Sequence, residues 1–525
     1  MKRFITLLLL LLVASIISAN EFIPGELLVQ FNKHTSSIEQ KAIIASENLT
    51  IIHQLSRRMN IWQCKIADNA SEQAHISSIL KHSSVKFAQL NHILELRETF
   101  PDDAGFNSQW CHDNNGQTGG LEDADMHSPA AWDINTGGVT ALGDTIVLAI
   151  VDNGTDLGHP DLNFYKNLLD TPGNGIDDDN NGYIDDYDGW NAYNHNGNPG
   201  SGSHGAHCCG IAAARGNNGI GVTGVNWNAK IMPVAGSSSS EATVVEAYGY
   251  VLEMRTTWNE TNGAAGAFVV ATNSSFGVNN GDPDNYPIWS AMYDSLGNVG
   301  ILSAAATMNN NSNVDITSDM PTACESPWLI SVTNTTDEDE RNTSAAYGLV
   351  TIDLGAPGTS IYSTDTNTAG YSYKTGTSMA TPQVTGAIGL LLSAAPAYLM
   401  EEYLANPADV ALLIKETILN SVDIIPDLDG ATVSGGRLNL HNALDLLISA
   451  EYGDLDDNGI VESYDAAILL MYVVGIDPGP DAPLPWEIWR QIRADVDGNT
   501  TIEAYDSSLI MRYVVGMIDH FPIEE

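Results

Sequence analysis

Hydrophobic positions form long unbroken runs in the middle of this chain, and these runs predict its main elements. Residues 146–151 are apolar without alternation, a pattern typical of a strand buried on both faces of a parallel sheet. Two further apolar strands are predicted at 267–272 and 300–306, the first after a helix-like stretch within 242–262. An Ala- and Leu-rich run at 384–395 is long enough for a helix. The central region therefore predicts an α/β fold around a mostly parallel sheet.

Residues 20–100 carry shorter patterns of strand and helix. A Pro-Gly turn opens a partly alternating strand, and helical periodicity then separates two further strand-like segments. The predicted elements are a strand at 22–31, a helix at 38–45, a strand at 61–66, a helix at 74–80 and a strand at 85–92. This pattern fits a small α+β module of about eighty residues.

Residues 1–19 have the composition of a secretory signal peptide. Lys2 and Arg3 precede a Leu-rich apolar core, and small residues lead to Ala19. The segment is too short and wrongly flanked for a stable membrane span, and no other segment approaches spanning length. We therefore expect an exported, extracellular protein without a membrane span.

The charge of the chain excludes some partners. Its 525 residues leave room for two or three domains, and 66 Asp and Glu outnumber 21 Lys and Arg, for a net charge of −45. Such a charge argues against nucleic acid or anionic membranes as partners. The acidic residues cluster in Asp/Asn/Gly runs, which indicates bound calcium; a saline habitat produces a similar balance.

The five cysteines leave their pairing open. They are Cys64, Cys111, Cys208, Cys209 and Cys324. An oxidising compartment permits disulfides among those that remain in the mature protein. A zinc site of His204, His207, Cys208 and Cys209 is disfavoured, because four ligands crowded on one helix cannot surround a metal tetrahedrally.

An acidic loop at 177–188 has the spacing of calcium ligands. Oxygen-bearing side chains fall at positions 1, 3, 5, 9 and 12, a glycine stands at position 6, and position 7 offers a backbone carbonyl. The predicted ligands are Asp177, Asp179, Asn181, Tyr183, Asp185 and Asp188. We expect structural Ca²⁺ here; the alternative is a solvated acidic turn.

The tail, residues 451–525, repeats this spacing twice, with the two copies 41 residues apart. Each loop precedes an apolar helix, at 466–475 and 507–516, and neither has a clear entering helix. The predicted ligands are Asp454, Asp456, Asn458, Ile460, Glu462 and Asp465 in the first loop, and Asp495, Asp497, Asn499, Thr501, Glu503 and Asp506 in the second. Both loops close with Asp rather than Glu.

Three segments carry the residue types of a hydrolytic triad. Asp152 ends the strand at 146–151, where α/β sheets place functional groups. His204 opens a helix of small residues, and Ser378 lies in a Gly-Thr-Ser-Met-Ala-Thr-Pro stretch before the helix at 384–395. A helix N-terminus favours the developing negative charge of an oxyanion.

These three segments, in the order Asp, His, Ser, resemble the signature blocks of the subtilisin-like serine peptidases, the subtilases. The resemblance implies a three-layer αβα catalytic domain with a mostly parallel sheet. It also implies that Asp152 orients the imidazole, that His204 acts as general base and then acid, and that Ser378 is the nucleophile.

The same resemblance implies further site residues. Ser275, Phe276 and Gly277 correspond to the strand end that pairs with the extended substrate, and the glycine leaves room for the first specificity pocket. Asn309 is expected to donate to the oxyanion, with Asn310 as the alternative because the local sequence departs from the family pattern.

Resemblance also implies the roles of both ends of the chain. Residues 20–100 resemble the inhibitory propeptide of subtilases, although a retained N-terminal domain is the alternative. Residues 451–525 resemble the dockerin module, which binds cohesin domains of scaffold or surface proteins; the alternative is a calcium-stabilised cap without a partner. The expected organisation is therefore 1–19 signal peptide, 20–100 propeptide, 101–450 catalytic domain and 451–525 dockerin-like module.

Together these features predict a secreted serine endopeptidase that cleaves protein or peptide substrates and is attached to a scaffold or cell surface through its tail. Two rival hypotheses explain the same sequence differently. One is a catalytically silent binding protein that keeps the fold as a scaffold, and the other is an adhesin whose purpose lies in the tail. Loss of hydrolysis in Ser378→Ala would exclude the first.

Overall fold

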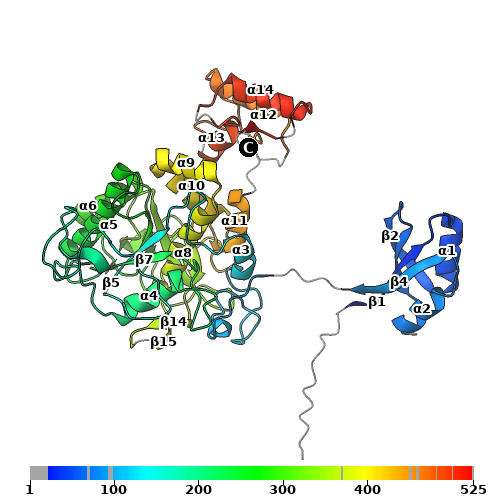
Figure 1. The fold of residues 1–525 in the computed structure, drawn as a ribbon, viewed down its shortest axis with the longest axis horizontal. Coiled ribbons are helices and arrows are strands. Elements are labelled where there is room, and N and C mark those ends of the chain that lie inside the picture. The colour runs from blue at the N-terminus through cyan, green and yellow to red at the C-terminus, as the bar shows by residue number, and fades with distance from the viewer. Residues whose placement is uncertain are drawn as a thin grey trace, which may run out of the picture. The chain divides into compact units, whose positions relative to one another are not determined.

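The computed structural model describes residues 22–67, 71–92, 98–367, 370–448, 452–456, 460–480, 482–486, 488–498, 501–518 and 520–522. The predicted signal peptide, 1–19, and the predicted ligands Asn458 and Asn499 lie outside these residues. The chain forms two compact units, Met1–Arg97 and Glu98–Glu525 (Figure 1).

The first unit is a four-stranded antiparallel sheet with two helices, in the sheet order β2-β3-β1-β4. Ser36 and Ser71 begin its helices, because their hydroxyls accept the N–H groups of the first turns. The predicted strands and helices are confirmed, and one further strand, β2, lies between α1 and β3. The elements are β1 (Phe22–Phe31), α1 (Ser37–Ser46), β2 (Leu49–Ser56), β3 (Ile61–Ile66), α2 (Glu72–Ile79) and β4 (Val85–His92).

A nine-stranded sheet organises the second unit, in the order β16-β17-β13-β12-β10-β8-β5-β7-β6. Its neighbouring strands are parallel except for β16 and β17, so the predicted mostly parallel sheet is confirmed. Its strands are β5 (Val147–Asp152), β6 (Trp190–Asn191), β7 (Lys230–Ala235), β8 (Val269–Ser274), β10 (Leu302–Ala306), β12 (Leu329–Thr335), β13 (Leu354–Pro357), β16 (Asp423–Ile424) and β17 (Gly436–Arg437).

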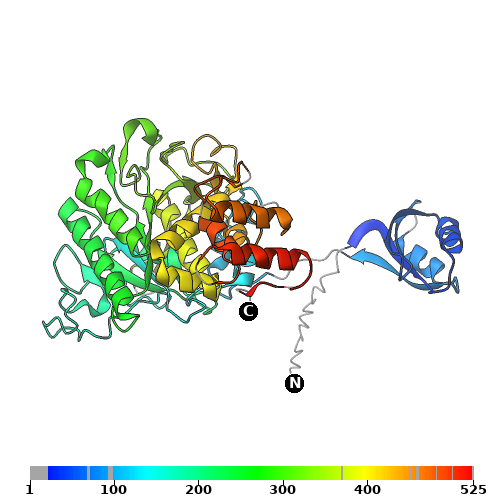
Figure 2. The same cartoon turned by 90° about the horizontal axis from the view of Figure 1, so that it is seen from above.

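The central strand β5 explains why its sequence does not alternate. Leu148 and Ile150 belong to one buried cluster, whereas Val147, Ala149 and Val151 belong to another on the opposite face. Successive side chains of a strand point to opposite faces, and here helices cover both. Helices α5 and α6 pack on one face, and α4, α8, α10 and α11 on the other (Figures 1 and 2).

The remaining elements connect this three-layer arrangement. The helices are α3 (Ser128–Ile134), α4 (Ser203–Ala213), α5 (Glu241–Thr261), α6 (Pro287–Asn298), α7 (Val314–Thr317), α8 (Thr377–Ala394), α9 (Ala397–Ala405), α10 (Pro407–Asn420) and α11 (Leu440–Ile448), with single 3-10 turns η1 (Phe106–Ser108), η2 (Asp186–Asp188) and η3 (Pro283–Asn285). Two small antiparallel pairs join β9 (Val278–Asn279) to β11 (Asp319–Met320), and β14 (Ile361–Asp365) to β15 (Gly370–Lys374).

The tail has a small core of its own. It contains α12 (Ser463–Val473), α13 (Ile488–Ala494) and α14 (Ala504–Val514), of which α13 was not predicted from the sequence. Helices α12 and α14 begin with the same capping box and pack against each other. The Ser507 hydroxyl donates to the carbonyl of Ala466, 2.8 Å away and 41 positions earlier, so equivalent points of the two repeats meet.

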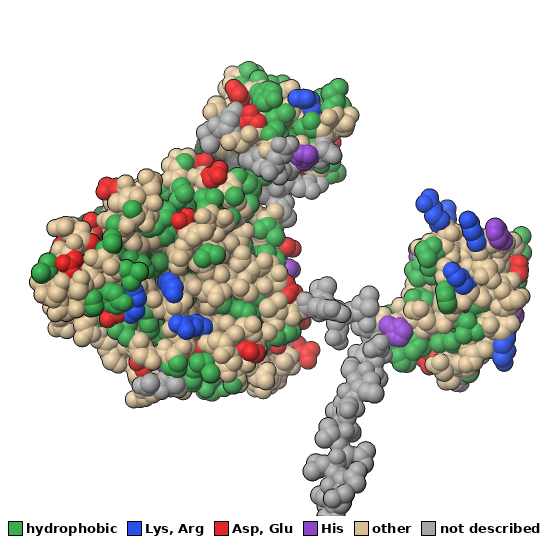
Figure 3. Space-filling model, in the orientation of Figure 1, with side chains coloured by type: hydrophobic (Ala, Val, Ile, Leu, Met, Phe, Trp, Pro, Cys, Tyr) green, Lys and Arg blue, Asp and Glu red, His purple; other side chains and the backbone are tan. Residues whose placement is uncertain are grey.

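All five cysteines are buried and free, and no disulfide joins them. Among the described residues no single helix meets the length and apolarity of a membrane span; one pair, α8 with α9, meets them jointly across a bend of 113°. On the face drawn in Figure 3, several Lys and Arg side chains lie on the first unit, and acidic side chains are scattered over the second.

Candidate active site

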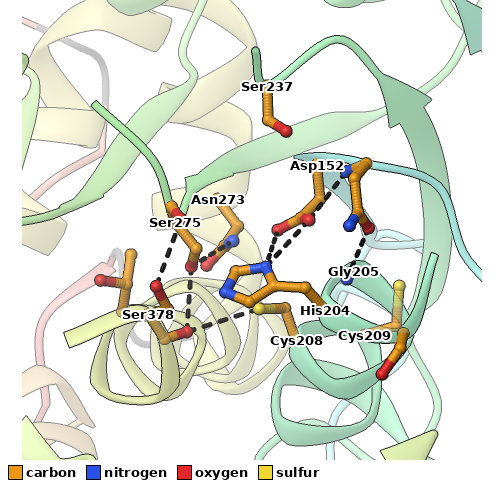
Figure 4. Close-up of polar contacts among 12 residues, drawn as sticks. Asp152, His204, Gly205, Cys208, Cys209, Ser237, Asn273, Ser275 and Ser378 are labelled. Carbon is orange, nitrogen blue, oxygen red and sulfur yellow. Dashed lines mark hydrogen bonds and ion pairs between the residues drawn. The ribbon is translucent and has the colours of Figure 1, made fainter. Parts of the chain in front are cut away.

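Asp152 and His204 meet where β5 ends and α4 begins. Asp152 is 2% exposed, and Nδ1 of His204 lies 3.0 and 2.9 Å from its two carboxylate oxygens (Figure 4). The Asn153 N–H donates to Asp152 Oδ1 at 2.7 Å, and Oδ1 of Asn153 accepts the N–H of Gly205. A Cβ at position 205 would lie 2.1 Å from the carbonyl oxygen of Gly154, so only glycine allows the helix to approach the strand this closely.

Opposing effects set the pKa of His204. Burial lowers this pKa, but the hydrogen bond and the negative charge of Asp152 together raise it by more. The pKa therefore lies above its usual value, even though the positive charge of Lys374 also lowers it. Asp152 therefore stabilises the imidazolium, which a base must form when it takes a proton from a nucleophile. The second ring nitrogen faces Ser275 and Ser378 (Figure 4).

Ser378 is the second residue of α8, at the helix N-terminus that the sequence predicts. Its hydroxyl donates to the backbone carbonyl of Ser275 at 3.2 Å, and no hydrogen bond joins it to His204 among the described residues. Ser275 in turn donates to the carbonyl of Ser378 at 3.0 Å and accepts from the amide of Asn273. Transfer of the Ser378 proton to His204 therefore requires rotation of the serine side chain, and such catalytic contacts commonly tighten only with substrate.

Asn309 contacts the segment that carries Ser378. Its Oδ1 accepts the backbone N–H of Thr377 at 3.0 Å. This bond fixes the amide, so that Nδ2 is its donor end. The amide of Asn310 instead faces Met308, whose Sδ lies 3.6 Å away. Among the described residues, Asn309 is therefore the candidate asparagine that contacts the start of α8.

The predicted substrate edge follows β8 directly. Ser275 is buried and its side chain braces Ser378, whereas the ring of Phe276 stacks on Trp289 at 6.0 Å between centroids. A Cβ at Gly277 would lie 2.2 Å from the carbonyl oxygen of Met320 in the adjoining β11. The missing side chain thus makes room for this backbone, a role that the sequence did not predict.

The family model for subtilases, peptidase family S8, matches residues 143–454, which is more than half of the chain. The chain belongs to the subtilase family. The model for the fervidolysin N-terminal prodomain matches residues 13–91, which covers most of the first unit. This subtilase therefore has a prodomain-like N-terminal unit.

Several curated proteins are similar to this subtilase. Subtilisin-like protease 1 of Plasmodium berghei is 28% identical over 343 residues, covering 60% of this chain and 52% of its own. Thermitase of Thermoactinomyces vulgaris is 29% identical over 324 residues, covering 61% and 93%. The extracellular protease of Xanthomonas campestris is 30% identical over 396 residues, covering 67% and 59%. The chain spans about half the length of the first of these relatives.

In the acidic loop of this subtilase, the predicted ligands fall into two sets with different partners. Asp177 and Asp179 lie together, and Asp179 shares the side-chain amides of Asn167 and Asn181 with Asp186, a residue that the sequence did not select. Asp186 is fully buried, and burial together with the charge of Asp179 raises its pKa to about 7, even though Asn167 and Asn181 donate to it.

The other predicted ligands of this loop have different partners. Asp185 accepts the backbone N–H groups of Asn174 and Gly175, and Asp188 forms an ion pair with Lys166. The Tyr183 ring packs against Trp190. Asp179 therefore lies near two other carboxylates, those of Asp177 and Asp186, and carboxylates are hard oxygen ligands suited to Ca²⁺.

Both tail loops bring three predicted ligands together. Oxygens of Asp454, Asp456 and Asp465 all lie within 4.8 Å of one another, and so do those of Asp495, Asp497 and Asp506. Glu462 and Glu503 cap α12 and α14, accepting the N–H of Asp465 and Asp506 respectively. Ile460 is exposed in the first loop, and Thr501 lies before α14 in the second.

A second acidic pair, Asp103 and Asp161, was not predicted from the sequence. Both are buried, and burial followed by their mutual repulsion raises the pKa of Asp103 to about 6. Oδ2 of Asp103 accepts the N–H of Asn217, while Oδ1 has no hydrogen-bond partner among the described residues. Asp161 accepts from Asn218 and Val222. Nothing in their spacing reveals the pair, because only the fold brings these distant segments together.

Cys208 lies beside the Asp152–His204 pair. Its Sγ is within 4.8 Å of a ligand atom of each, and its thiol donates to the backbone carbonyl of Ser378 at 3.4 Å. Burial raises the pKa of this thiol well above its usual value, so it is neutral. His207, one turn along, instead contacts the carbonyl of Ser372, so the two histidines face different groups.

Proposed function

We propose that this subtilase is a secreted serine endopeptidase that hydrolyses peptide bonds through an acyl-enzyme on Ser378. The observation that carries the proposal is the buried Asp152 carboxylate on Nδ1 of His204, with the other ring nitrogen facing the side chain at the start of α8. The family membership and the names of its relatives, which include an extracellular protease, support hydrolysis and export.

The proposed reaction begins when the Ser378 hydroxyl leaves the carbonyl of Ser275 and turns to His204. His204 takes the proton as Oγ bonds to the scissile carbonyl carbon, and Asp152 stabilises the imidazolium without being protonated. Nδ2 of Asn309 and the N–H groups at the start of α8 stabilise the tetrahedral oxyanion. His204 then protonates the leaving amine, and water, deprotonated by His204, releases the acid from Ser378.

We assign structural Ca²⁺ to the acidic loop and to the two tail loops. Asp177, Asp179 and Asp186 would hold the ion in the acidic loop, because Asp179 lies near both of the other carboxylates, and neighbouring carboxylates repel each other unless a cation or protons neutralise them. In the tail, Asp454, Asp456 and Asp465 and their repeat counterparts would hold one ion each. The metal supplies charge neutralisation and stability, and takes no part in the reaction.

The two ends of the chain extend this proposal. The prodomain match supports an inhibitory propeptide in the first unit, within the expected 20–100, followed by a catalytic domain at 101–450. The paired loops and the packed helices α12 and α14 support a dockerin-like module at 451–525 that binds a cohesin-type partner. Such binding would attach the protease to a scaffold or cell surface.

Ser378→Ala in the full chain tests the proposed activity. The expected result is loss of casein hydrolysis and of labelling by a fluorophosphonate, with the thermal unfolding of the zymogen unchanged. The rival hypothesis, a catalytically silent binding or adhesion protein, expects no hydrolysis by the wild type either. Equal hydrolysis by both variants would refute the assignment of Ser378.

A further inference from the structure

A buried carboxylate that the reaction does not use lies close to the oxyanion segment. Asp319 is 2% exposed and belongs to β11, which pairs with β9 just beyond the predicted substrate edge. Its Oδ2 accepts the hydroxyl of Thr322 at 2.7 Å and that of Thr307 at 3.4 Å.

One of these donors, Thr307, lies two residues before Asn309. Thr307 and Met308 connect β10 to Asn309, so the bond of Thr307 to Asp319 helps to fix the direction in which the chain leaves the sheet. The Thr307 carbonyl accepts the hydroxyl of Thr377 at 2.6 Å, and Asn309 accepts the Thr377 N–H. A continuous series of hydrogen bonds therefore runs from Asp319 to the residue before Ser378.

We propose that Asp319 is a positioning residue, which holds the Thr307–Asn309 segment so that Asn309 donates to the oxyanion. The inference rests on the proposed function and deepens it. Oxyanion stabilisation depends on donors that are already in place when charge develops, and displacement by about 1 Å costs about 100-fold in rate.

The energetics of the site support this role. Burial raises the pKa of Asp319 to about 7 despite the surrounding donors, so the carboxylate is held at a cost in desolvation. If the side chain of residue 319 served only to pack β11, it would need no charge, because an apolar side chain of similar volume would fill the space without this desolvation cost. A polar acceptor at this point instead determines the position of Thr307, and with it the segment that leads to Asn309.

Asp319→Asn in the matured full-length enzyme tests the inference. The substitution keeps the shape but replaces one acceptor oxygen with an amide nitrogen that cannot accept from the surrounding hydroxyl groups. We expect kcat per titrated active site to fall by about 10- to 100-fold with KM within about 2-fold, because ground-state binding does not use the oxyanion donor. The affinity of a peptide aldehyde, whose adduct places an oxyanion at the site, should fall by a similar factor.

A double-mutant cycle with Asn309→Ala tests whether Asp319 acts through Asn309. If it does, adding Asp319→Asn to Asn309→Ala lowers kcat by less than about 2-fold, whereas independent effects would multiply. Asp315→Asn is the matched control: Asp315 lies four residues earlier and anchors Val350 and Thr351, away from Asn309. We expect its kcat to equal that of the wild type.

Several results would overturn the inference. Multiplicative losses in the cycle, or a lower melting temperature with unchanged kcat, would make Asp319 a structural group. A loss confined to substrates with Lys or Arg before the scissile bond would instead make it part of a specificity pocket. If Asp319→Asn does not fold, Thr307→Val decides, because it removes one donor to Asp319: unchanged kcat would refute the inference. Lack of hydrolysis by the wild type would refute the proposed function as well.

Discussion

The side chains of Ser275 and Ser378 each donate a hydrogen bond to the backbone carbonyl of the other, at 3.0 and 3.2 Å. The two residues are 103 positions apart, one just after β8 and the other at the start of α8. This reciprocal pair fastens the helix that carries the nucleophile to the predicted substrate edge. It also holds the Ser378 hydroxyl on a carbonyl until it rotates toward His204.

Ser275→Ala removes one half of this pair. We expect kcat to fall about 3- to 10-fold, because the start of α8 loses an anchor, and the free energy of unfolding to fall by about 1 kcal/mol. Active-site titration with steady-state kinetics, and thermal unfolding of the same sample, measure the two effects. Ser290→Ala, whose hydroxyl contacts Cys324 instead, serves as control. Unchanged kcat would show that the pair has no role in catalysis.

Asp152→Asn should lower kcat by about 10⁴-fold while KM changes little. The amide cannot stabilise the imidazolium and favours the wrong tautomer of His204. Single-turnover acylation with an activated ester measures the loss directly. A loss of less than 10-fold would contradict the proposed role of Asp152.

The pH dependence of kcat/KM should follow the ionisation of His204. Activity requires the neutral imidazole, so kcat/KM rises with pH through the His204 pKa, which the hydrogen bond to Asp152 holds above its usual value against burial. Lys374, bonded to Ser203 and Asp365, lowers this pKa. Lys374→Gln is therefore expected to move the acid limb to higher pH, and a shift to lower pH would contradict this explanation.

Calcium removal should destabilise the protein. An ion that binds only the folded state adds about 2.7 kcal/mol at a concentration 100-fold above its Kd, so EGTA is expected to lower the melting temperature and calcium to restore it. Asp186→Asn should reduce the part of this effect due to the acidic loop. Asp188→Asn should not, because Asp188 pairs with Lys166. If Asp188→Asn reduced the effect of calcium and Asp186→Asn did not, the result would favour the ligand set predicted from the sequence.

The tail is expected to bind its partner independently of catalysis. Asp465→Ala and Asp506→Ala each remove the last carboxylate of one loop, so they should weaken calcium binding and capture by a panel of immobilised cohesin domains. Hydrolysis of a short soluble peptide should stay within 2-fold of the wild type. Retained capture by a variant that no longer binds calcium would refute the dockerin-like role.

The local sequence was sufficient to predict a strand or a helix start wherever the residue pattern itself reflects burial or capping. The unbroken run 146–151 becomes β5, because both faces of that strand are covered. Ser378 lies at a helix start, as the Gly-Thr-Ser stretch predicts. The repeat in the tail predicts both α12 and α14, because the same pattern of ligands and capping residues precedes each helix. The short β2 and α13 were missed, because neither has a strong periodic pattern.

By itself, then, the sequence determined the parallel sheet, the family resemblance, the order of the three reactive residues and the paired loops of the tail. Only the tertiary structure decided which side chains from distant segments contact each other: Ser275 with Ser378, Asp186 with Asp179, and Asp319 with the segment before Asn309. The physical reason is that a strand or a cap is encoded within a few neighbouring residues, whereas a contact between distant side chains depends on register and packing. That is also why the role of Gly277, set by the backbone of Met320, was not visible beforehand.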